Sequence, residues 1–241
     1  MSFVRRALAI MVAGAFLLLA QGPPAFDVVS IKVSEHRVGP DYNNRFSFDP
    51  ATFTARNATL RRLIAEAWQM QVRQVIGPDW LDRDEFEVVA KAPAPIARAQ
   101  VALMLRTVLT ERFRLAHHRE TRDMRVYELV QGKGGAKLDR ANGGFHGTMR
   151  QFADLLAVKL SIVMSDDPTR PGMAAGPPVL VLDKTGLAGE YDIPIEVRPE
   201  PGADSFSLWQ HALENMGLRL ERRRDAVEVL VIDSAERVPI E

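Results

Sequence analysis

The sequence predicts an α+β protein with two similar α/β halves, each made of helices packed on a small, mostly antiparallel sheet. Three observations support this prediction. Hydrophobic residues make up 46% and charged residues 26% of the 241-residue chain, which is an ordinary globular composition. Short runs of alternating apolar residues, typical of strands, are interspersed with apolar stripes at helical spacing. A glycine-rich segment at 132–144 separates two series of such elements.

The first half is predicted to span residues 26–131. Its clearest helical stripe begins with Leu60 and Leu63, on one face of a helix expected over 59–70. A second helix is expected over 96–112. Strands are expected at 26–33, 45–48, 52–56, 85–91, 113–120 and 125–131.

The second half is predicted to span residues 145–239. Helices are expected at 148–160 and 207–216, and strands at 179–182, 191–197, 218–222 and 227–233. Thr148 can cap the first of these helices. Ser207 and Gln210 have the spacing of a capping box, and Gly217 stands where a helix ends in a left-handed residue. The similar order of elements indicates a duplication, and chance recurrence of common α/β units is the alternative.

The first twenty or so residues differ in kind from the rest of the chain. Arg5 and Arg6 precede an uncharged apolar run at 7–20, and the sequence QGPP at 21–24 ends it. This order is typical of a secretory signal peptide, and the run is shorter than the roughly 20 residues that a bilayer span needs. We therefore expect residues 1–20 to be a signal peptide and the mature chain to be periplasmic or extracellular, without stable membrane insertion. An uncleaved anchor is the alternative.

Charge and cysteine content narrow the classes of function. Cleavage after residue 20 removes two arginines and no acids, which leaves 29 basic against 31 acidic residues. That balance does not favour a nucleic acid or an anionic membrane as partner. The chain contains no cysteine, which excludes disulfides, thiolate metal sites and a cysteine nucleophile.

His118 and Glu120 are the candidate metal ligands. They belong to the sequence HHRE at 117–120, and alternate residues of a strand share one face. Two ligands on one strand could form part of a zinc site if His36, His146 or His211 came close. The alternative is a solvated strand face with cross-strand charge pairs.

Three further motifs resemble known catalytic or binding sequences. Lys184-Thr185-Gly186 matches the K-T-G of serine β-lactamases, but the S-x-x-K that such enzymes need is missing from the sequence, so a turn is favoured. The glycine-rich sequence at 132–137 departs from the phosphate-loop pattern. The acids at 79–85 surround Trp80. A turn anchored by the tryptophan is favoured, and paired-carboxylate hydrolysis or sugar binding is the alternative.

Several motifs carry a resemblance to a known family. They are ARNATL at 55–60, GPDWL at 77–81, ERF at 111–113, HRET at 118–121, LDKTGL at 182–187 and VLVID at 229–233. With these motifs in order from Phe26 onward, the chain resembles the soil-associated exported bacterial proteins of unknown function (domain of unknown function 3738). The resemblance implies secretion and no particular activity. Residues 59–91 and 207–233 are each similar to the short N-terminal domains of secretins and TonB-dependent receptors, which are periplasmic modules that act by protein contact.

We therefore expect a non-enzymatic periplasmic or extracellular binding module. An exposed strand edge could pair with another envelope protein, and no catalytic residue or cofactor is predicted. The alternatives are an exported hydrolase or metal-dependent enzyme, with an unrecognised site at His118, Glu120 or residues 79–84, and a purely structural envelope protein.

Overall fold

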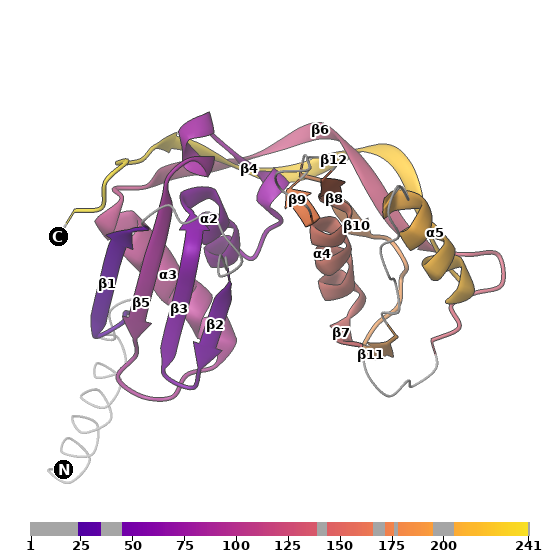
Figure 1. Cartoon of the computed structure of the whole chain (residues 1–241), viewed down its shortest axis with the longest axis horizontal. Helices are drawn as coiled ribbons and strands as arrows, with labels where there is room; N and C mark the ends of the chain where they lie inside the picture. Colours follow the sequence, from indigo (N-terminus) through magenta and orange to yellow (C-terminus); the bar gives the residue numbers. More distant parts are fainter. Residues whose placement is uncertain are drawn as a thin grey trace, which may run out of the picture. The chain divides into compact units, whose positions relative to one another are not determined.

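The computed structural model describes residues 24–34, 45–138, 144–165, 172–175, 178–194 and 205–240. The predicted signal peptide, His36 and most of the glycine- and proline-rich segment that follows residue 165 lie outside these ranges. The predicted fold class is confirmed, since helices pack on several mostly antiparallel sheets (Figure 1).

The described chain divides into two compact units. The first unit contains the residues up to Gln69, Pro78–Ala116 and the residues from Asp233 onward. The second unit contains Met70–Gly77 and His117–Ile232. The boundaries of these units therefore differ from those of the predicted halves, 26–131 and 145–239. The chain changes from one unit to the other after residues 69, 77, 116 and 232, and not within the glycine-rich segment at 132–144.

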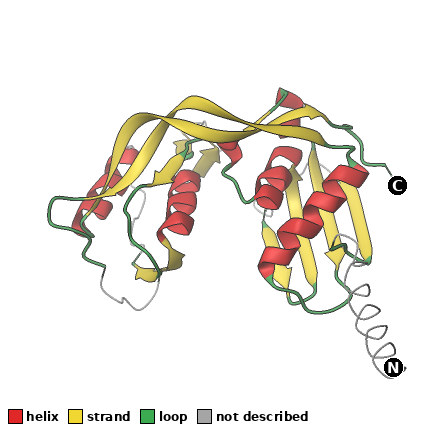
Figure 2. Ribbon diagram, turned by 180° about the vertical axis from the view of Figure 1, so that it is seen from behind, coloured by secondary structure: helices red, strands yellow, loops and turns green. Residues whose placement is uncertain are grey.

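The first unit is a four-stranded antiparallel sheet with helices on one face (Figures 1 and 2). Its strands are β1 (Val28–Val33), β2 (Phe46–Asp49), β3 (Thr52–Thr59) and β5 (Glu85–Lys91), in the order β1-β5-β3-β2. The covering helices are α2 (Leu60–Trp68) and α3 (Arg98–Arg112). A short helix, η2 (Asp79–Asp82), precedes β5.

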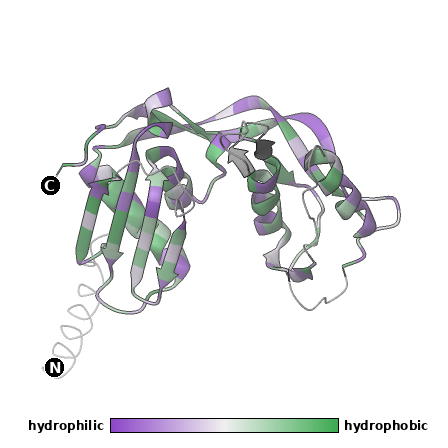
Figure 3. Cartoon of the chain, in the orientation of Figure 1, coloured by the Kyte–Doolittle hydropathy of each residue, from purple (hydrophilic) through white to green (hydrophobic). Residues whose placement is uncertain are grey.

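Strand alternation explains which face of this sheet is buried. Val88 of β5 lies opposite Ile31 of β1 and Ala55 of β3, and Val88 and Ala55 are buried. Val89, one residue along β5, points to the other face and is exposed. Hydrophobic residues accordingly run through the strands of this sheet (Figure 3).

The second unit is built on two long strands, β6 (Ala116–Gln131) and β12 (Leu218–Ser234). Its main sheet has the order β10-β6-β12-β4, in which β10 (Val181–Asp183) runs parallel to β6 and β4 (Val75–Ile76) runs parallel to β12. The remaining elements are η1 (Val72–Gln74), β7 (Phe145–Thr148), α4 (Met149–Leu160), β8 (Ile162–Ser165), β9 (Gly172–Ala175), β11 (Glu190–Ile193) and α5 (Ser205–Asn215).

The long strands correct two expectations from the sequence. The runs 113–120 and 125–131 were predicted as two strands around Asp123, yet β6 continues through this residue. The runs 218–222 and 227–233 are likewise joined in the single strand β12. Asp123 pairs with Arg224 of β12, 2.7 Å from its Nη2, and Arg119 pairs with Glu228. These charged side chains are exposed to solvent and paired across the two strands, so they do not interrupt either strand. Both strands carry long hydrophilic stretches (Figure 3).

The start of the glycine-rich segment is a packed part of the second unit. The backbone N–H of Gly132 donates to the carbonyl of Gly217 at 2.8 Å, and that of Lys137 donates to the carbonyl of Met216 at 2.8 Å. Gly217 has a φ of +68°, which agrees with the predicted left-handed helix end. Residues 132–137 therefore cap the turn between α5 and β12.

Two helix starts were predicted from capping residues, with different outcomes. Thr148 caps α4 as expected, since its Oγ1 accepts a hydrogen bond from the N–H of Gln151 at 3.3 Å. The capping box expected from Ser207 does not start α5, because that helix already begins at Ser205. Gln210 instead accepts a hydrogen bond from the N–H of Leu220 at 3.1 Å.

Candidate functional site

His118 and Glu120 lie on one face of β6, as predicted. His118 Nε2 is 3.7 Å from Glu120 Oε2, both side chains are exposed, and Glu120 also pairs with Arg122. Over the described ranges, no group of three or more His, Asp or Glu side chains is arranged to hold a metal ion. Metal binding by His118 and Glu120 therefore stays a prediction.

The other histidines named with this site have different surroundings. His146 on β7 lies between two acids of β11: its Nδ1 is 2.7 Å from Asp192 Oδ1, and its Nε2 is 3.5 Å from Glu190 Oε2. The hydrogen bond that His146 Nδ1 donates to the Asp192 carboxylate raises the pKa of His146 above its usual value. His211 is exposed on α5. Neither is grouped with His118 in a set of potential metal ligands within the described structure.

The acids at 79–85 connect elements of the first unit. Arg61 Nε donates to both carboxylate oxygens of Asp82, at 2.9 and 2.8 Å. Arg237, near the C-terminus, pairs with Asp84, and this hydrogen bond lowers the pKa of the carboxyl. Leu81 is fully buried and Trp80 is half-buried, so both side chains contribute to holding this segment against the unit.

The K-T-G sequence forms a turn after β10. Asp183 Oδ1 accepts hydrogen bonds from the N–H of Thr185 at 2.9 Å and from its hydroxyl at 2.7 Å. Gly186 follows with a φ of +69°, and Lys184 Nζ lies 2.8 Å from Asp225 Oδ2. Thr185 and Gly186 thus shape the turn, and Lys184 pairs with Asp225 of β12.

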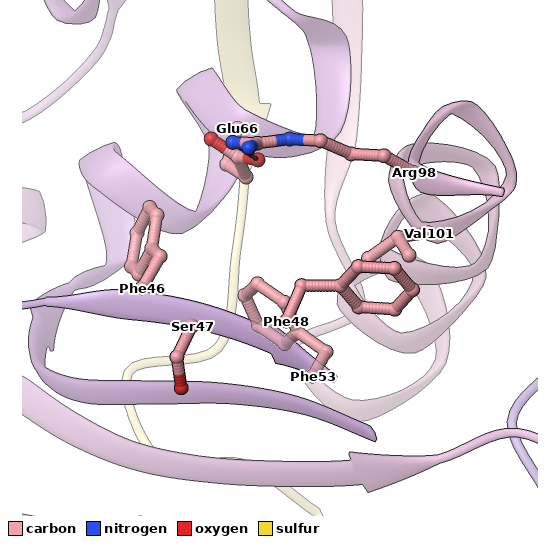
Figure 4. Close-up of a pocket in the computed structure, with 7 residues that line it drawn as sticks. All are labelled: Phe46, Ser47, Phe48, Phe53, Glu66, Arg98 and Val101. Atoms are coloured by element: carbon pink, nitrogen blue, oxygen red, sulfur yellow. Dashed lines mark hydrogen bonds and ion pairs between the residues drawn. The ribbon is translucent and has the colours of Figure 1, made fainter. Parts of the chain in front are cut away.

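A cavity in the first unit is the candidate site that the sequence did not reveal. We call it the phenylalanine notch; it is lined by Phe46, Ser47, Phe48, Phe53, Glu66, Arg98 and Val101 (Figure 4). Its space, open solvent included, is about 270 Å³. The residues come from β2, β3, α2 and α3.

The apolar part of the notch follows from the β2–β3 hairpin. Phe48 lies opposite Phe53, and Phe46 lies two residues before Phe48 on the same strand face. Phe53 is buried, but Phe46 and Phe48 are only half-buried, because β2 is at the edge of the sheet. Figure 4 shows both rings on the side of the helices, with Ser47 directed away.

Charged groups form the rim of the notch. Arg98 at the start of α3 reaches toward Glu66 on α2, with 3.5 Å between Nη2 and Oε1 (Figure 4). The Arg98 side chain remains 77% exposed in this pair and Glu66 29%. The guanidinium of Arg62 lies 5.0 Å from the centre of the Phe46 ring. Arg98 and Glu66 thus border the notch, and Arg62 lies against the Phe46 ring.

The outer edge of β2 adds backbone hydrogen-bonding groups. The N–H of Arg56 on β3 donates to the carbonyl of Arg45 at 3.0 Å, so odd-numbered residues of the hairpin strand turn their backbone groups toward β3. The N–H and C=O groups of Phe46 and Phe48 consequently point out of the sheet. No strand of the described chain pairs with β2 on that side.

A sequence signal for part of this site exists. Phe46, Phe48 and Phe53 show strand alternation around a turn, which predicts that they share a face. The positions of Glu66 and Arg98 above that face depend on how two helices pack across a sheet, and no local pattern encodes it.

Comparisons with known proteins place the chain in a family without giving it an activity. A family model described as "Protein of unknown function (DUF3738)" matches residues 61–235, which is more than half of the chain. Neither the search of curated proteins nor the search of solved structures returned a match. Within the described residues, no helix is long and apolar enough to cross a membrane.

Proposed function

The chain belongs to this family of unknown function, DUF3738, and we propose that it is an exported, non-enzymatic binding module. Its partner is an extended segment of another envelope protein, which adds as a strand to the edge of β2. One observation carries the proposal: the outward N–H and C=O groups of Phe46 and Phe48 lie directly beside a notch lined by half-buried phenylalanines.

The outer edge of β2 provides the two features that strand addition requires, open backbone hydrogen-bonding groups and a cavity for side chains. Main-chain hydrogen bonds to an open edge supply affinity, and a cavity for alternate side chains supplies specificity. An added strand would place every second side chain on the helix side of the sheet, where the phenylalanine notch lies. The half-buried rings of Phe46 and Phe48 would then lose contact with water.

The opposite edge of the sheet is a weaker candidate. The N–H of Ser34 donates to the carbonyl of Glu85 at 2.7 Å, so Val29, Ile31 and Val33 of β1 turn their backbone groups outward. Lys32 lies within this strand, and a lysine on an edge strand opposes pairing with another chain. The notch is at β2, so we assign binding to that edge.

Export is supported by the N-terminal sequence, with Arg5, Arg6 and the apolar run at 7–20. The similarity of residues 59–91 and 207–233 to periplasmic modules that act by protein contact points the same way. An exported module without disulfides depends on its core for stability, and both units have buried apolar cores.

Photo-cross-linking in an envelope extract tests the site. With p-benzoylphenylalanine in place of Phe48 we expect one discrete adduct, which excess unlabelled wild-type protein competes away. The same cross-linker at Val158, which is 58% exposed on α4, is the positional control. Equal adducts at both positions, or no adduct at Phe48, would contradict the proposal.

Two substitutions then test strand addition itself. Phe48→Ala and Phe48→Pro both remove the ring, but only proline also removes the outward N–H. We expect the captured partner to bind the proline variant about two- to tenfold more weakly than the alanine variant, which corresponds to one hydrogen bond. Equal affinity for the two variants would show that the β2 backbone takes no part.

A further inference from the structure

The edge strand β2 has a sequence that is complementary to itself. Together with the residue before it, β2 reads RFSFD, from Arg45 to Asp49. When two such segments pair antiparallel about Ser47, each phenylalanine lies opposite a phenylalanine and each arginine lies opposite an aspartate. A register centred on either phenylalanine would place a charged residue opposite Ser47 and lose this match. The pattern of charged and apolar residues therefore favours one register.

The backbone of β2 presents hydrogen-bonding groups in the same register. The N–H and C=O groups of Phe46 and Phe48 point away from β3, and no strand of the described chain pairs with them. In the register centred on Ser47, Phe46 of one copy lies opposite Phe48 of the other, so the two residues exchange hydrogen bonds in both directions. Two-fold symmetry repeats this pair on the other side of Ser47. The two Ser47 residues then face each other in a non-hydrogen-bonded pair.

The side chains of this segment lie on faces that suit the pairing. Phe46 and Phe48 are half-buried on the side of the helices, and Ser47 is directed to the other face (Figure 4). Arg45 and Asp49 share the face of Ser47 by strand alternation, and both are exposed. A two-fold axis perpendicular to the sheet keeps the helices of both copies on one side. The phenylalanines of both copies therefore meet on that side, and the arginine–aspartate pairs form on the other.

We propose that two copies of this chain pair through β2 and continue the four-stranded sheet of the first unit across a two-fold axis at Ser47. Cross-strand aromatic pairs and opposite-charge pairs both stabilise such an edge. Pairing also covers an open strand edge, which natural proteins otherwise protect against uncontrolled association. The dimer uses the same edge as the proposed strand addition and does not depend on it. A partner strand therefore has to displace the second copy before it binds.

Disulfide formation at Ser47 tests the register. The chain contains no cysteine, so one introduced thiol reports on one position. Opposite residues of a non-hydrogen-bonded pair are about 4.5 Å apart between Cα atoms, a distance that a disulfide can bridge. Ser47→Cys, prepared without residues 1–20, should form a covalent dimer on mild oxidation, seen on a non-reducing gel. Asp49→Cys should not, because the two copies of residue 49 lie about 13 Å apart along the strands. Lys91→Cys, exposed on the same face of the sheet, is the control for random collision.

Charge exchange tests the pairs between Arg45 and Asp49 without a cross-link. Arg45→Glu places like charges opposite each other on both sides of the axis, and Asp49→Lys does so with the opposite sign. We expect each variant to dimerise at least about tenfold more weakly than wild type in sedimentation velocity at low ionic strength. The double variant has the net charge of wild type and should recover its affinity. Lys91→Glu makes the same charge change as Arg45→Glu on the central strand β5 and should dimerise like wild type. Thermal unfolding shows whether each variant folds.

Failure of the dimer and failure of strand addition give different results. A wild-type chain that stays monomeric up to about 1 mM, or a Ser47→Cys variant that oxidises no faster than Lys91→Cys, overturns the inference and leaves strand addition by another protein standing. A double variant as weak as the single variants shows that Arg45 and Asp49 do not face each other, which also overturns the inference. If the dimer forms as expected and the cross-linker at Phe48 captures only a second copy of the chain, the inference stands and the proposed function fails.

Discussion

Replacing Gly217 with alanine should destabilise the second unit strongly. Gly217 has a φ of +68°, and a Cβ added there would lie 2.1 Å from the carbonyl oxygen of Gly135 and 3.1 Å from the N of Lys137. Carbon and oxygen atoms cannot approach to 2.1 Å without a bond, so the backbone of the glycine-rich segment must move away.

The cost has two parts. A left-handed conformation costs a non-glycine residue about 1–2 kcal/mol. Displacing residues 132–137 also breaks the two 2.8 Å hydrogen bonds that hold them to Gly217 and Met216, each of which is worth about 0.5–1.5 kcal/mol. The sum is about 2–5 kcal/mol, a large share of the roughly 5–15 kcal/mol that stabilises a typical domain.

Hydrogen exchange followed by mass spectrometry measures this loss for each unit separately. Gly186→Ala is the matched control, because Gly186 has nearly the same φ, +69°, and a Cβ added there meets no atom within 4 Å. It should cost only the conformational part. If Gly217→Ala loses no more protection than Gly186→Ala in peptides of the second unit, the close approach of Gly135 does not constrain the fold and the reasoning is wrong.

Three further predictions concern titration and export. Burial raises the pKa of half-buried Asp154, so folding favours its protonated form and stability falls as pH rises through the folded-state pKa. Asp154→Asn should therefore stabilise the chain in urea unfolding at pH 7 but not at pH 3, and equal effects at both would refute this. The pKa of His146 is raised, chiefly by Asp192, so its contribution is complete below the unfolded pKa near 6.5 and is lost as pH rises through the folded value. His146→Gln should speed exchange of β7 and β11 amides at pH 5.5 and not at pH 9; a loss independent of pH would exclude the ion pair as cause. The exported protein should begin at Gln21 in N-terminal sequencing, and a retained Met1 would contradict cleavage.

Helices were the most predictable part of the fold. The predicted ranges 59–70 and 148–160 correspond to α2 (Leu60–Trp68) and α4 (Met149–Leu160). Each helix buries one apolar face and begins at a threonine whose side chain caps it: Thr59 Oγ1 accepts from the N–H of Arg62, as Thr148 does from Gln151. Both signals are local in sequence, so they can be recognised without the tertiary structure.

Long-range pairing was not predictable, and Gln71 illustrates why. Its side-chain amide donates to the carbonyl of Val181 at 2.6 Å and accepts from the N–H of Val181 at 2.9 Å. It also donates to Asp154 at 2.8 Å. These contacts tie residues 70–77 to the second unit, although the neighbouring helix α2 belongs to the first. The side-chain amide of Gln71 thus takes the place of a backbone strand partner for Val181, which is 110 residues away. No local sequence pattern around Gln71 indicates this role.

The difference between local patterns and long-range packing also explains why the sequence predicted only part of the candidate site. Alternation predicts that Phe46, Phe48 and Phe53 share a face, but only the packed helices decide that Phe53 is buried while β2 is left half-covered. Full burial of a phenylalanine side chain is worth about 1.5–3 kcal/mol, so the half-buried rings of Phe46 and Phe48 do not gain all of that free energy. They also stand beside open backbone groups, a combination that favours pairing with another chain. Strand addition at β2 would bury the rings and pair the backbone groups in one step, which is why the two features are most simply explained together.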